Sequence, residues 1–327
     1  MASERASVAV IGGGPWGLAL AAAAARTGRP ALLHSRRTLG AALPPGVTQV
    51  GEYADLAERS RLIVLAVPSE AAHEVARRLG EVIDGRHLVV HGVRGLVGDD
   101  MATISDVVRL ETPARRVGAL GGPALADELL ANRPCVMVCG SHYPEVNAAL
   151  SHAFVSETLR MYTTSDLRGL EWASALVGCL AIGIGYAQAL GASPGLVAAT
   201  ISRAVQEAAR LAAAAGGDEC TLLGLAGYGD LLASIGQAER PEIVLGRALA
   251  TGSALDAAMK EAKLRIEAIE LIPRVVAWAE RHAVRAPIFT ALGRGVLGSR
   301  PAGEIVHDLM TGPQDEAHGD GARHEAR

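Results

Sequence analysis

Apolar runs and helix-forming tracts alternate along the first half of the chain. Residues 8–11 form an uninterrupted apolar run that breaks into glycines and then into an Ala-rich tract reaching about Thr27. Such runs are typical of buried parallel strands, and the tracts between them of crossover helices. Ser69, which follows one apolar run, is the expected N-cap of the next helix. The pattern predicts strands at 8–11, 30–34, 61–68, 87–91, 116–120 and 134–139, with helices after the first run, around 52–58 and over 69–79.

Helical periodicity replaces this alternation beyond about residue 163. The order of elements predicts an α/β protein, in which an N-terminal Rossmann-type, doubly wound and mostly parallel sheet precedes an all-helical C-terminal domain. We expect the sheet domain over 1–162, the helical domain over 163–312 and a disordered tail over 313–327, which is polar and has no apolar face. The periodic tracts are 166–190, 195–215, 254–262, 266–281, 287–296 and 301–309.

One helical tract resembles a membrane span, because residues 173–201 contain no charged side chain. Glycines and Pro194 interrupt it, and Gln188 lies inside it. A span needs about 20 consecutive and predominantly apolar residues. We therefore expect a buried central helix that ends near Gly191, and no membrane insertion.

The glycines after the first apolar run have the spacing Gly12-x-Gly14-x-x-Gly17. In a strand-turn-helix unit, this spacing lets the backbone approach a pyrophosphate closely at the N-terminus of the helix. Pro15 and Trp16 complete the turn, and Pro15 suits the first helical turn. The turn predicts dinucleotide binding; the other interpretation is a tight strand-to-helix turn that binds nothing.

The residues at the end of the second predicted strand help to distinguish NAD from NADP as the bound dinucleotide. Strict NAD sites usually have an acidic residue about 20 positions beyond the glycines, which binds the ribose 2′-hydroxyl. Here Ser35, Arg36 and Arg37 stand at the tip, and guanidinium groups suit a 2′-phosphate. This favours NADP over NAD, although the two arginines also fit the interpretation of solvated loop charges.

Composition narrows the classes of partner. The 327 residues are 50% hydrophobic, and 31 Lys and Arg against 35 Asp and Glu give a formal net charge of −4. This balance gives no electrostatic reason to expect nucleic acid or an anionic membrane as a partner. Ten dispersed histidines suggest no metal site, and a short charged N-terminal segment suggests a cytoplasmic protein without a signal peptide. Buried, reduced thiols are expected at Cys135, Cys139, Cys179 and Cys220.

Together, several motifs make the chain resemble the NAD(P)-dependent glycerol-3-phosphate dehydrogenases of the bacterial type. The resemblance spans about residues 8–310, and its most specific motif is Leu-Ala-Gly-Tyr-Gly-Asp-Leu at 225–231. The other motifs are Gly-Gly-Gly-Pro-Trp-Gly at 12–17, Val-Pro-Ser at 67–69, Arg94-Gly95, Gly122-Pro123 with Ala126 and Glu128, Gly169-x-Glu171, and Arg203.

The resemblance implies hydride transfer between dihydroxyacetone phosphate and sn-glycerol 3-phosphate, which supplies glycerophospholipid precursors. It implies a homodimer, with the cofactor on the first domain and also near Pro68 and Glu270. Family sites are similar in using two lysines, an aspartate, a threonine and an Arg-Asn pair that holds the phosphate. At these positions the chain has Arg94 for the first lysine, Asp230, Ser234 for the threonine, and Arg240.

Two positions depart from the family pattern. Val177-Gly178 replaces the second lysine and its asparagine, and Pro241 replaces the asparagine after Arg240. Reducing a ketone needs a cation or acid beside the carbonyl oxygen, and losing such a group costs a factor of about 10² to 10⁴ in rate. Valine supplies neither. The chain has no lysine before Lys260 that would replace it.

Two functions stay open on the sequence. In one, the protein is an NAD(P)-dependent oxidoreductase, weak or altered in substrate, with Arg94, Asp230, Ser234 and Arg240 at the phosphorylated substrate and a proton from water, Tyr186, Tyr228 or Asp230. In the other, it is a catalytically degenerate nucleotide-binding protein with a sensing or protein-interaction role. These residues also have interpretations without a functional role. Asp230 suits the N-cap of the following helix, and Arg94 and Arg240 suit solvated loop charges.

Overall fold

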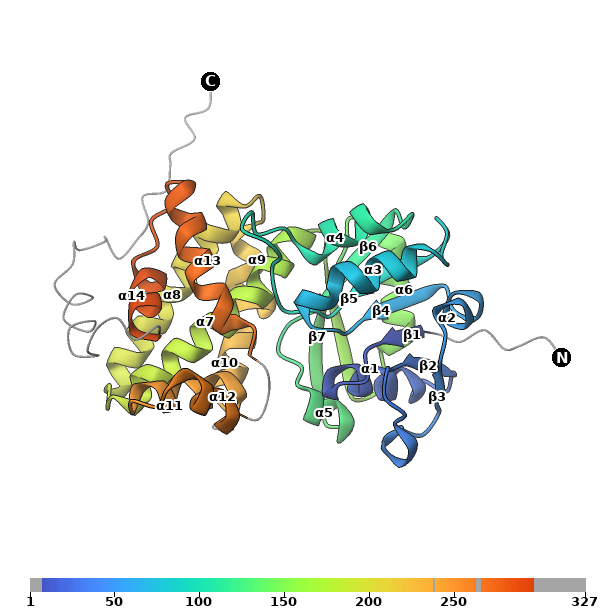
Figure 1. The fold of residues 1–327 in the computed structure, drawn as a ribbon, viewed down its shortest axis with the longest axis horizontal. Coiled ribbons are helices and arrows are strands. Elements are labelled where there is room, and N and C mark those ends of the chain that lie inside the picture. The colour runs from blue at the N-terminus through green and yellow to red at the C-terminus, as the bar shows by residue number, and fades with distance from the viewer. Residues whose placement is uncertain (1–7, 238, 263–265, 297–327) are drawn as a thin grey trace, which may run out of the picture.

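The computed structural model describes residues 8–237, 239–262 and 266–296. A sheet domain and a helical domain lie side by side in it, with the first strand in the former and the last described helix in the latter (Figure 1). The helix expected at 301–309 and the tail expected at 313–327 lie outside the described residues.

Eight strands form one sheet. They are β1 (Val8–Ile11), β2 (Ala31–His34), β3 (Val47–Val50), β4 (Leu62–Leu65), β5 (Leu88–His91), β6 (Arg116–Gly121), β7 (Cys135–Gly140) and β8 (Leu159–Thr164). Their order is β3-β2-β1-β4-β5-β6-β7-β8, and each neighbouring pair is parallel except β6 with β7. The prediction of a mostly parallel, doubly wound sheet is confirmed.

The hydrophobic pattern predicts neither β3 nor β8, which are the two edge strands. Thr48 and Gln49 of β3 are exposed or half-buried, and Leu159 is the one fully buried residue of β8. An edge strand has one neighbour and an open side, so it needs no continuous apolar run. Interior strands such as β1 and β4 are buried at every residue.

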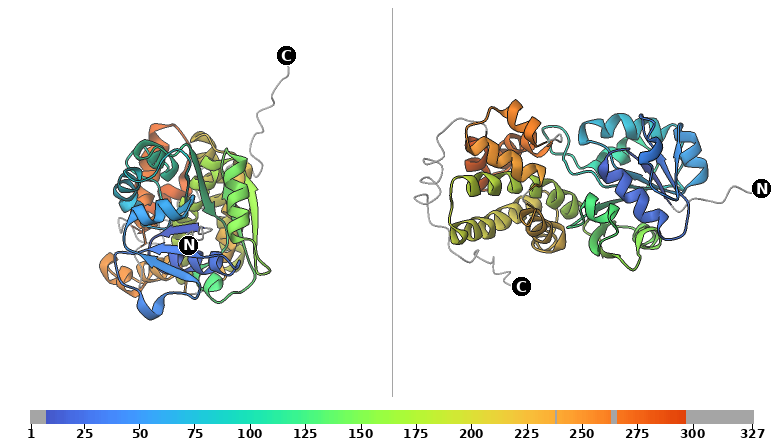
Figure 2. Two further views of the ribbon diagram at one scale, coloured as in Figure 1. Left: turned by 90° about the vertical axis from the view of Figure 1, so that its right-hand side faces the viewer. Right: turned by 90° about the horizontal axis from the view of Figure 1, so that it is seen from below.

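Two apolar cores lie on opposite faces of the sheet because successive side chains of a strand alternate between faces. Val8 and Val10 of β1 pack in one core, whereas Ala9 and Ile11 pack in the other. The first core includes residues of α1 (Pro15–Ala25), α5 (Ala126–Leu130) and α6 (Pro144–Phe154). The second includes residues of α2 (Tyr53–Arg59), α3 (Ala72–Gly80) and α4 (Ile104–Glu111). The first view of Figure 2 shows the sheet between helices.

The prediction that Ser69 caps the helix after β4 is wrong. A 3₁₀ turn at Ser69–Ala71 leads into α3, and no side chain caps either start. The Ser69 hydroxyl instead donates to the carboxylate of Glu267, which lies in the helical domain. Ser69 therefore bonds to a residue 198 positions away instead of to the backbone of the helix that follows it.

The helical domain is built around α7 (Leu167–Ala189), which is buried from Leu167 to Gly185 apart from Arg168 and Gly183. By length and composition alone α7 could cross a membrane, but 83% of its most apolar window is buried inside the protein. It is the predicted core helix. Around it lie α8 (Pro194–Ala214), α9 (Glu219–Leu223), α10 (Asp230–Ile235), α11 (Pro241–Ala250), α12 (Leu255–Glu261), α13 (Ala268–Arg281) and α14 (Pro287–Val296).

The cysteines are free thiols, as expected, but their burial differs. Cys139 and Cys179 are buried, and burial raises the pKa of Cys139 to about 11. Cys135 is half-buried. The prediction of burial is wrong for Cys220, which is exposed in the first turn of α9, a short helix with a single buried residue.

Candidate active site

The predicted glycine turn lies where the strand order of the sheet changes direction. β2 and β3 extend the sheet on one side of β1, and β4 to β8 extend it on the other. Open α/β sheets bind ligands at such a switch point, beyond the carboxyl ends of the strands. The turn joins β1 to α1 there, so its position is that of a ligand site.

Three glycines of the turn are required by packing. A Cβ on Gly12 would lie 2.0 Å from the carbonyl oxygen of Ala66, and Gly12 has a φ of +134°. A Cβ on Gly17 would lie 1.9 Å from the carbonyl oxygen of Gly12, and one on Gly13 would lie 2.3 Å from the Ser35 hydroxyl. By contrast, a Cβ on Gly14 would meet nothing within 4 Å. Packing therefore does not require glycine at position 14, where the chain borders open space.

The start of α1 fits a bound anion. Gly14 is the N-cap residue, so no side chain covers the first N–H groups, and Pro15 at the first position has no N–H. The described part of α1 has no acidic residue in its first turn. An uncapped helix N-terminus with a favourable dipole is a ready site for a pyrophosphate. The residues present therefore fit a dinucleotide.

Ser35, Arg36 and Arg37 follow β2 at the same edge of the sheet. The Ser35 hydroxyl accepts a hydrogen bond from the Arg37 backbone N–H at 3.2 Å. An Nη2 of Arg37 lies 3.3 Å from the Gly13 carbonyl oxygen, so this side chain reaches back over the glycine turn. Both arginines are exposed. The three residues thus flank the turn, where the adenosine half of a dinucleotide would lie.

Arg94 lies on the loop that follows β5, beside the glycine turn. A Cβ on Gly92 of this loop would come within 2.5 Å of the indole nitrogen of Trp16. The guanidinium of Arg94 crosses to the helical domain, where its Nη2 lies 3.2 Å from Oδ1 and 3.0 Å from Oδ2 of Asp230. The loop joins the nucleotide side of the site to the helical side.

Asp230 is the first residue of α10 and has no exposed surface. Gly229 occupies the N-cap position, so the alternative prediction that Asp230 is an N-cap residue is wrong. Its Oδ1 lies 3.7 Å from Nη1 of Arg240, whose side chain is 5% exposed. Arg240 also donates from Nε to Glu242 at 3.0 Å. The two arginines are therefore not solvated loop charges.

The cluster holds unused hydrogen-bonding capacity. Burial raises the pKa of Asp230, and the Arg94 and Arg240 guanidinium groups oppose that rise. Within the described residues, Arg94 Nη1 is buried without a hydrogen bond, and Asp230 Oδ2 and Arg240 Nη1 are held only by the ion pairs at 3.0 and 3.7 Å. Buried polar atoms are costly to leave unpaired. The two guanidinium groups therefore keep N–H donors for a ligand that carries an anionic or carbonyl oxygen.

Comparison with known families decides which ligand-binding fold this is. The N-terminal model of NAD-dependent glycerol-3-phosphate dehydrogenase matches residues 7–147, and the C-terminal model matches 166–307. A relative from Chlorobium luteolum is 30% identical over 93% of this chain and 97% of its own length. The chain belongs to this dehydrogenase family.

Named relatives and solved structures agree with the assignment. The relatives from Chlorobium luteolum and from Agathobacter rectalis, the latter 29% identical over 93% of this chain and 95% of its own, are both named glycerol-3-phosphate dehydrogenase (NAD(P)+). The solved glycerol-3-phosphate dehydrogenase of Coxiella burnetii is 27% identical, covers 94% of this chain and 99% of its own, and has a TM-score of 0.86. The predicted family, its oxidoreductase class and its use of NAD or NADP are confirmed.

Among the residues carried over from the dehydrogenase family, Ser234 is oriented inward. Its side chain is fully buried, and its hydroxyl donates to the carbonyl oxygen of Asp230 at 2.5 Å. Serine and threonine hydroxyls often bond four residues back in a helix. The hydroxyl therefore holds the first turn of α10 rather than pointing at the unpaired atoms of Arg94 and Arg240.

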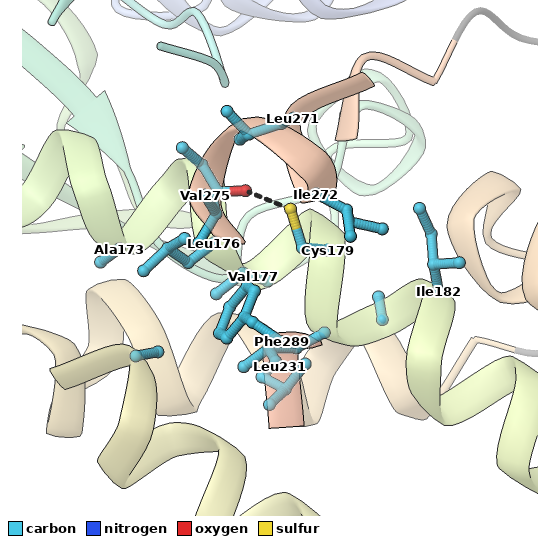
Figure 3. Packing of buried hydrophobic residues seen from close by; sticks show 14 of the residues in the cluster. Ala173, Leu176, Val177, Cys179, Ile182, Leu231, Leu271, Ile272, Val275 and Phe289 are labelled. Atoms are coloured by element: carbon cyan, nitrogen blue, oxygen red, sulfur yellow. Dashed lines mark hydrogen bonds between the residues drawn. The ribbon is translucent and has the colours of Figure 1, made fainter. Parts of the chain in front are cut away.

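Val177, which is predicted to stand at the family lysine position, lies inside the apolar core of the helical domain. Its side chain is 2% exposed and lines the same apolar contact as Leu176 and Leu231, the residue after Asp230. Figure 3 shows it near Leu231 and Phe289. The described residues that line this contact have apolar side chains or, at Gly227, none. In this dehydrogenase the polar site is therefore formed without α7 at this position.

A buried pair behind Arg94 supports its loop and was not predicted. Nε2 of His91, at the end of β5, lies 2.8 Å from Glu171 of α7, and Nδ1 accepts the Val93 N–H at 3.4 Å. Glu171 also accepts the Ser105 N–H at 2.8 Å. The sequence motif contains Glu171, but only the fold reveals the partners that fix the backbone before Arg94.

The second unpredicted contact joins the domains at the carboxyl end of β4. Glu267 accepts the Ser69 backbone N–H at 3.0 Å. It comes one helical turn before Glu270, the predicted cofactor residue, which is exposed in the first turn of α13. Pro68, also predicted, is exposed beside Ser69. No local signal marks Glu267, because its partner lies in another domain.

Proposed function

We propose that the protein interconverts dihydroxyacetone phosphate and sn-glycerol 3-phosphate with NADP or NAD, and so supplies a glycerophospholipid precursor. The names of its relatives support this substrate. The observation that carries the proposal is that Arg94 Nη1 and Arg240 Nη1, two buried donors without a hydrogen bond, belong to side chains that both pair with the buried Asp230. These donors match a substrate with a carbonyl oxygen and an anionic group.

The chemistry needs a cation and a proton at the carbonyl oxygen. A bound nicotinamide cofactor supplies the hydride. Negative charge then grows on the oxygen, and the guanidinium of Arg94 stabilises it. Guanidinium is a poor acid, because it stays protonated at neutral pH. Asp230 is the candidate proton donor inside the cluster, where burial raises the pKa of its carboxyl group and the guanidinium groups of Arg94 and Arg240 oppose that rise.

Arg240 is the proposed anchor for the phosphate. Its Nη1 is buried and free of hydrogen bonds within the described chain. Pro241, which follows it, offers neither a side-chain amide nor a backbone N–H. The phosphate is therefore held by fewer groups than the Arg-Asn pair of the family provides, and a high KM is expected.

We also propose a cofactor preference, an oligomeric state and a cellular location for the protein. The exposed guanidinium groups of Arg36 and Arg37 support a preference for NADPH over NADH. The resemblance supports a homodimer and a cytoplasmic location. Titration with both cofactors tests the preference, and light scattering of the purified protein tests the dimer.

Steady-state oxidation of NADPH and NADH by the purified protein with dihydroxyacetone phosphate tests the activity. We expect turnover above background, and a loss of about 10² to 10⁴ in kcat for Arg94→Ala. Arg86→Ala is the matched control, because Arg86 lies before β5 and its side chain is 82% exposed.

Cofactor binding is measured in parallel by fluorescence titration. Tight binding with no turnover at any substrate concentration would contradict the proposal. It would instead support the catalytically degenerate protein, in which the nucleotide domain serves a sensing or protein-interaction role.

A further inference from the structure

One buried serine of the described chain differs from the others in its hydrogen bonding. The hydroxyl of Ser174, a residue 3% exposed, is buried and has no partner among the described residues. The remaining buried serines all place the hydroxyl within hydrogen-bond distance of another group, and they are Ser60, Ser105, Ser141 and Ser234. Buried polar groups in folded proteins are nearly always paired, so the exception calls for an explanation.

The Ser174 hydroxyl is turned toward the sheet domain. A helical serine often donates to the carbonyl oxygen four residues back, but the structure shows no such bond from Ser174 to Leu170. Instead, a Cβ built on Gly121 would come within 2.6 Å of Ser174 Oγ. Gly121 is the last residue of β6. Its lack of a side chain leaves the room that the hydroxyl occupies, between α7 and the carboxyl end of the strand.

The carboxyl end of β6 belongs to the site. β1, β4, β5 and β6 are linked by parallel pairs, so the glycine turn, the Arg94 loop and Gly121 lie at one edge of the sheet. The carbonyl oxygen of Gly122, the next residue, lies 3.4 Å from Nη2 of Arg94. Ser174 therefore lies beside the segment that contacts the guanidinium assigned to the carbonyl oxygen of the substrate.

Ser174 also lies on the face of α7 where the resemblance predicts a lysine. It precedes Val177 by three residues, which is about one helical turn and about 4.5 Å along the axis at 1.5 Å per residue. Glu171, one turn earlier on the same face, contacts His91 of the sheet domain at 2.8 Å. This face of α7 therefore carries a hydroxyl at the domain boundary, one turn from the missing cation.

We propose that Ser174 is a catalytic residue whose hydroxyl donates a hydrogen bond to the carbonyl oxygen of the substrate. Negative charge grows on that oxygen as the cofactor delivers its hydride, so the bond is stronger in the transition state than in the ground state. Ser174 keeps its proton, and the proton of the product comes from Asp230, as proposed above. The inference rests on the proposed function for the identity of the substrate.

Ser174→Ala should have opposite effects on the free protein and on its complexes. In the free protein it removes an unpaired buried hydroxyl, so the melting temperature should be unchanged or higher. In the full-length protein saturated with NADPH, calorimetry should show an affinity for sn-glycerol 3-phosphate lower by about fivefold, which corresponds to about 1 kcal/mol. The kcat/KM for dihydroxyacetone phosphate should fall by about tenfold or more, and NADPH affinity should not change.

Ser141→Ala is the matched control. Ser141 is 2% exposed, and its hydroxyl donates to the Val117 carbonyl oxygen at 2.7 Å. Val117 is near the amino end of β6, at the opposite edge of the sheet from Gly121. Loss of this bond should lower the melting temperature by about 2 to 4 °C and leave kcat/KM and the affinity for glycerol 3-phosphate unchanged.

Three results would overturn the inference. They are a Ser174→Ala protein that melts below the wild type or does not fold, an affinity of this variant for glycerol 3-phosphate within about twofold of the wild type, and a wild type that does not bind glycerol 3-phosphate. None of these measurements needs turnover. The proposed function fails separately, if dihydroxyacetone phosphate supports no NADPH or NADH oxidation.

Discussion

The nucleotide half and the substrate half of the site are built in different ways. The nucleotide half is made of backbone, because Gly12 and Gly17 allow close approach and Gly14 leaves open space. The substrate half is made of side chains, because Arg94, Asp230 and Arg240 come from separate loops and helices and meet only in the fold. The nucleotide half depends on glycines that lack a Cβ, and the substrate half depends on ion pairs between buried side chains. They should therefore respond differently to substitution.

The largest effect is expected from a substitution in the nucleotide half of the site. Gly17→Ala places a Cβ 1.9 Å from the Gly12 carbonyl oxygen, so the turn must rearrange. We expect loss of measurable NADPH binding together with a clear fall in melting temperature. Gly14→Ala is the matched variant, because its Cβ meets nothing within 4 Å and its φ of −81° suits any residue.

Gly14→Ala should weaken NADPH binding while leaving the melting temperature of the free protein unchanged. Fluorescence titration and thermal unfolding of both variants measure the two effects. Equal loss of stability in the two variants would show that Gly14 serves packing and not a ligand.

The next largest effect is expected from a substitution in the substrate half of the site. Asp230→Asn keeps the shape of a fully buried side chain but removes the charge that faces two arginines. Leaving buried charges without their partner costs about 3 to 5 kcal/mol. We expect unfolding free energy to fall by about 3 kcal/mol and kcat by about 10² or more. Asp127→Asn, with a side chain 69% exposed, serves as the control in denaturant unfolding and rate assays.

A third substitution tests whether the substrate half can accept the family cation. Val177→Lys buries an amine among apolar side chains, where Val177 is 2% exposed. An unpaired buried charge is among the few causes of large destabilisation, and we expect a loss of about 3 kcal/mol. Val177→Met adds length without charge and should cost less. A stable Val177→Lys protein with raised turnover would show that the ammonium reaches the Arg94 cluster.

The last prediction concerns a buried carboxyl group outside the site, whose effect on stability depends on pH. Glu207 of α8 accepts the backbone N–H groups of Ile288 and Phe289 at 2.9 and 2.7 Å, and burial raises its pKa to about 7. Between its ordinary value of 4.5 and about 7, the folded protein keeps a proton that the unfolded chain has lost. Stability should therefore fall as pH rises through this window, by at most about 3 kcal/mol at 1.36 kcal/mol per unit.

Denaturant unfolding at several pH values measures this slope, and Glu207→Gln should flatten it. A slope that is unchanged in the variant would assign the pH dependence to other groups, of which the buried Asp230 is the first to test.

The local pattern of residues is enough to predict the interior of the sheet and the nucleotide turn. Buried parallel strands such as β1 and β4 have to be continuous apolar runs, and a turn that tolerates no Cβ has to be glycine, so both leave a local record. The long apolar α7 is visible for the same reason. The edge strands β3 and β8 leave no such record, because an open edge requires no apolar run.

The pairing of the charged residues is visible only once the chain is folded. Motifs identified Arg94, Asp230 and Arg240, but not that Asp230 is buried between the two arginines or that Ser234 is turned to the backbone. The contact of Glu267 with Ser69 spans 198 positions. Spacing along the chain cannot encode such pairs, because the energy of a charge depends on which groups folding brings within a few ångströms and on how much water it removes.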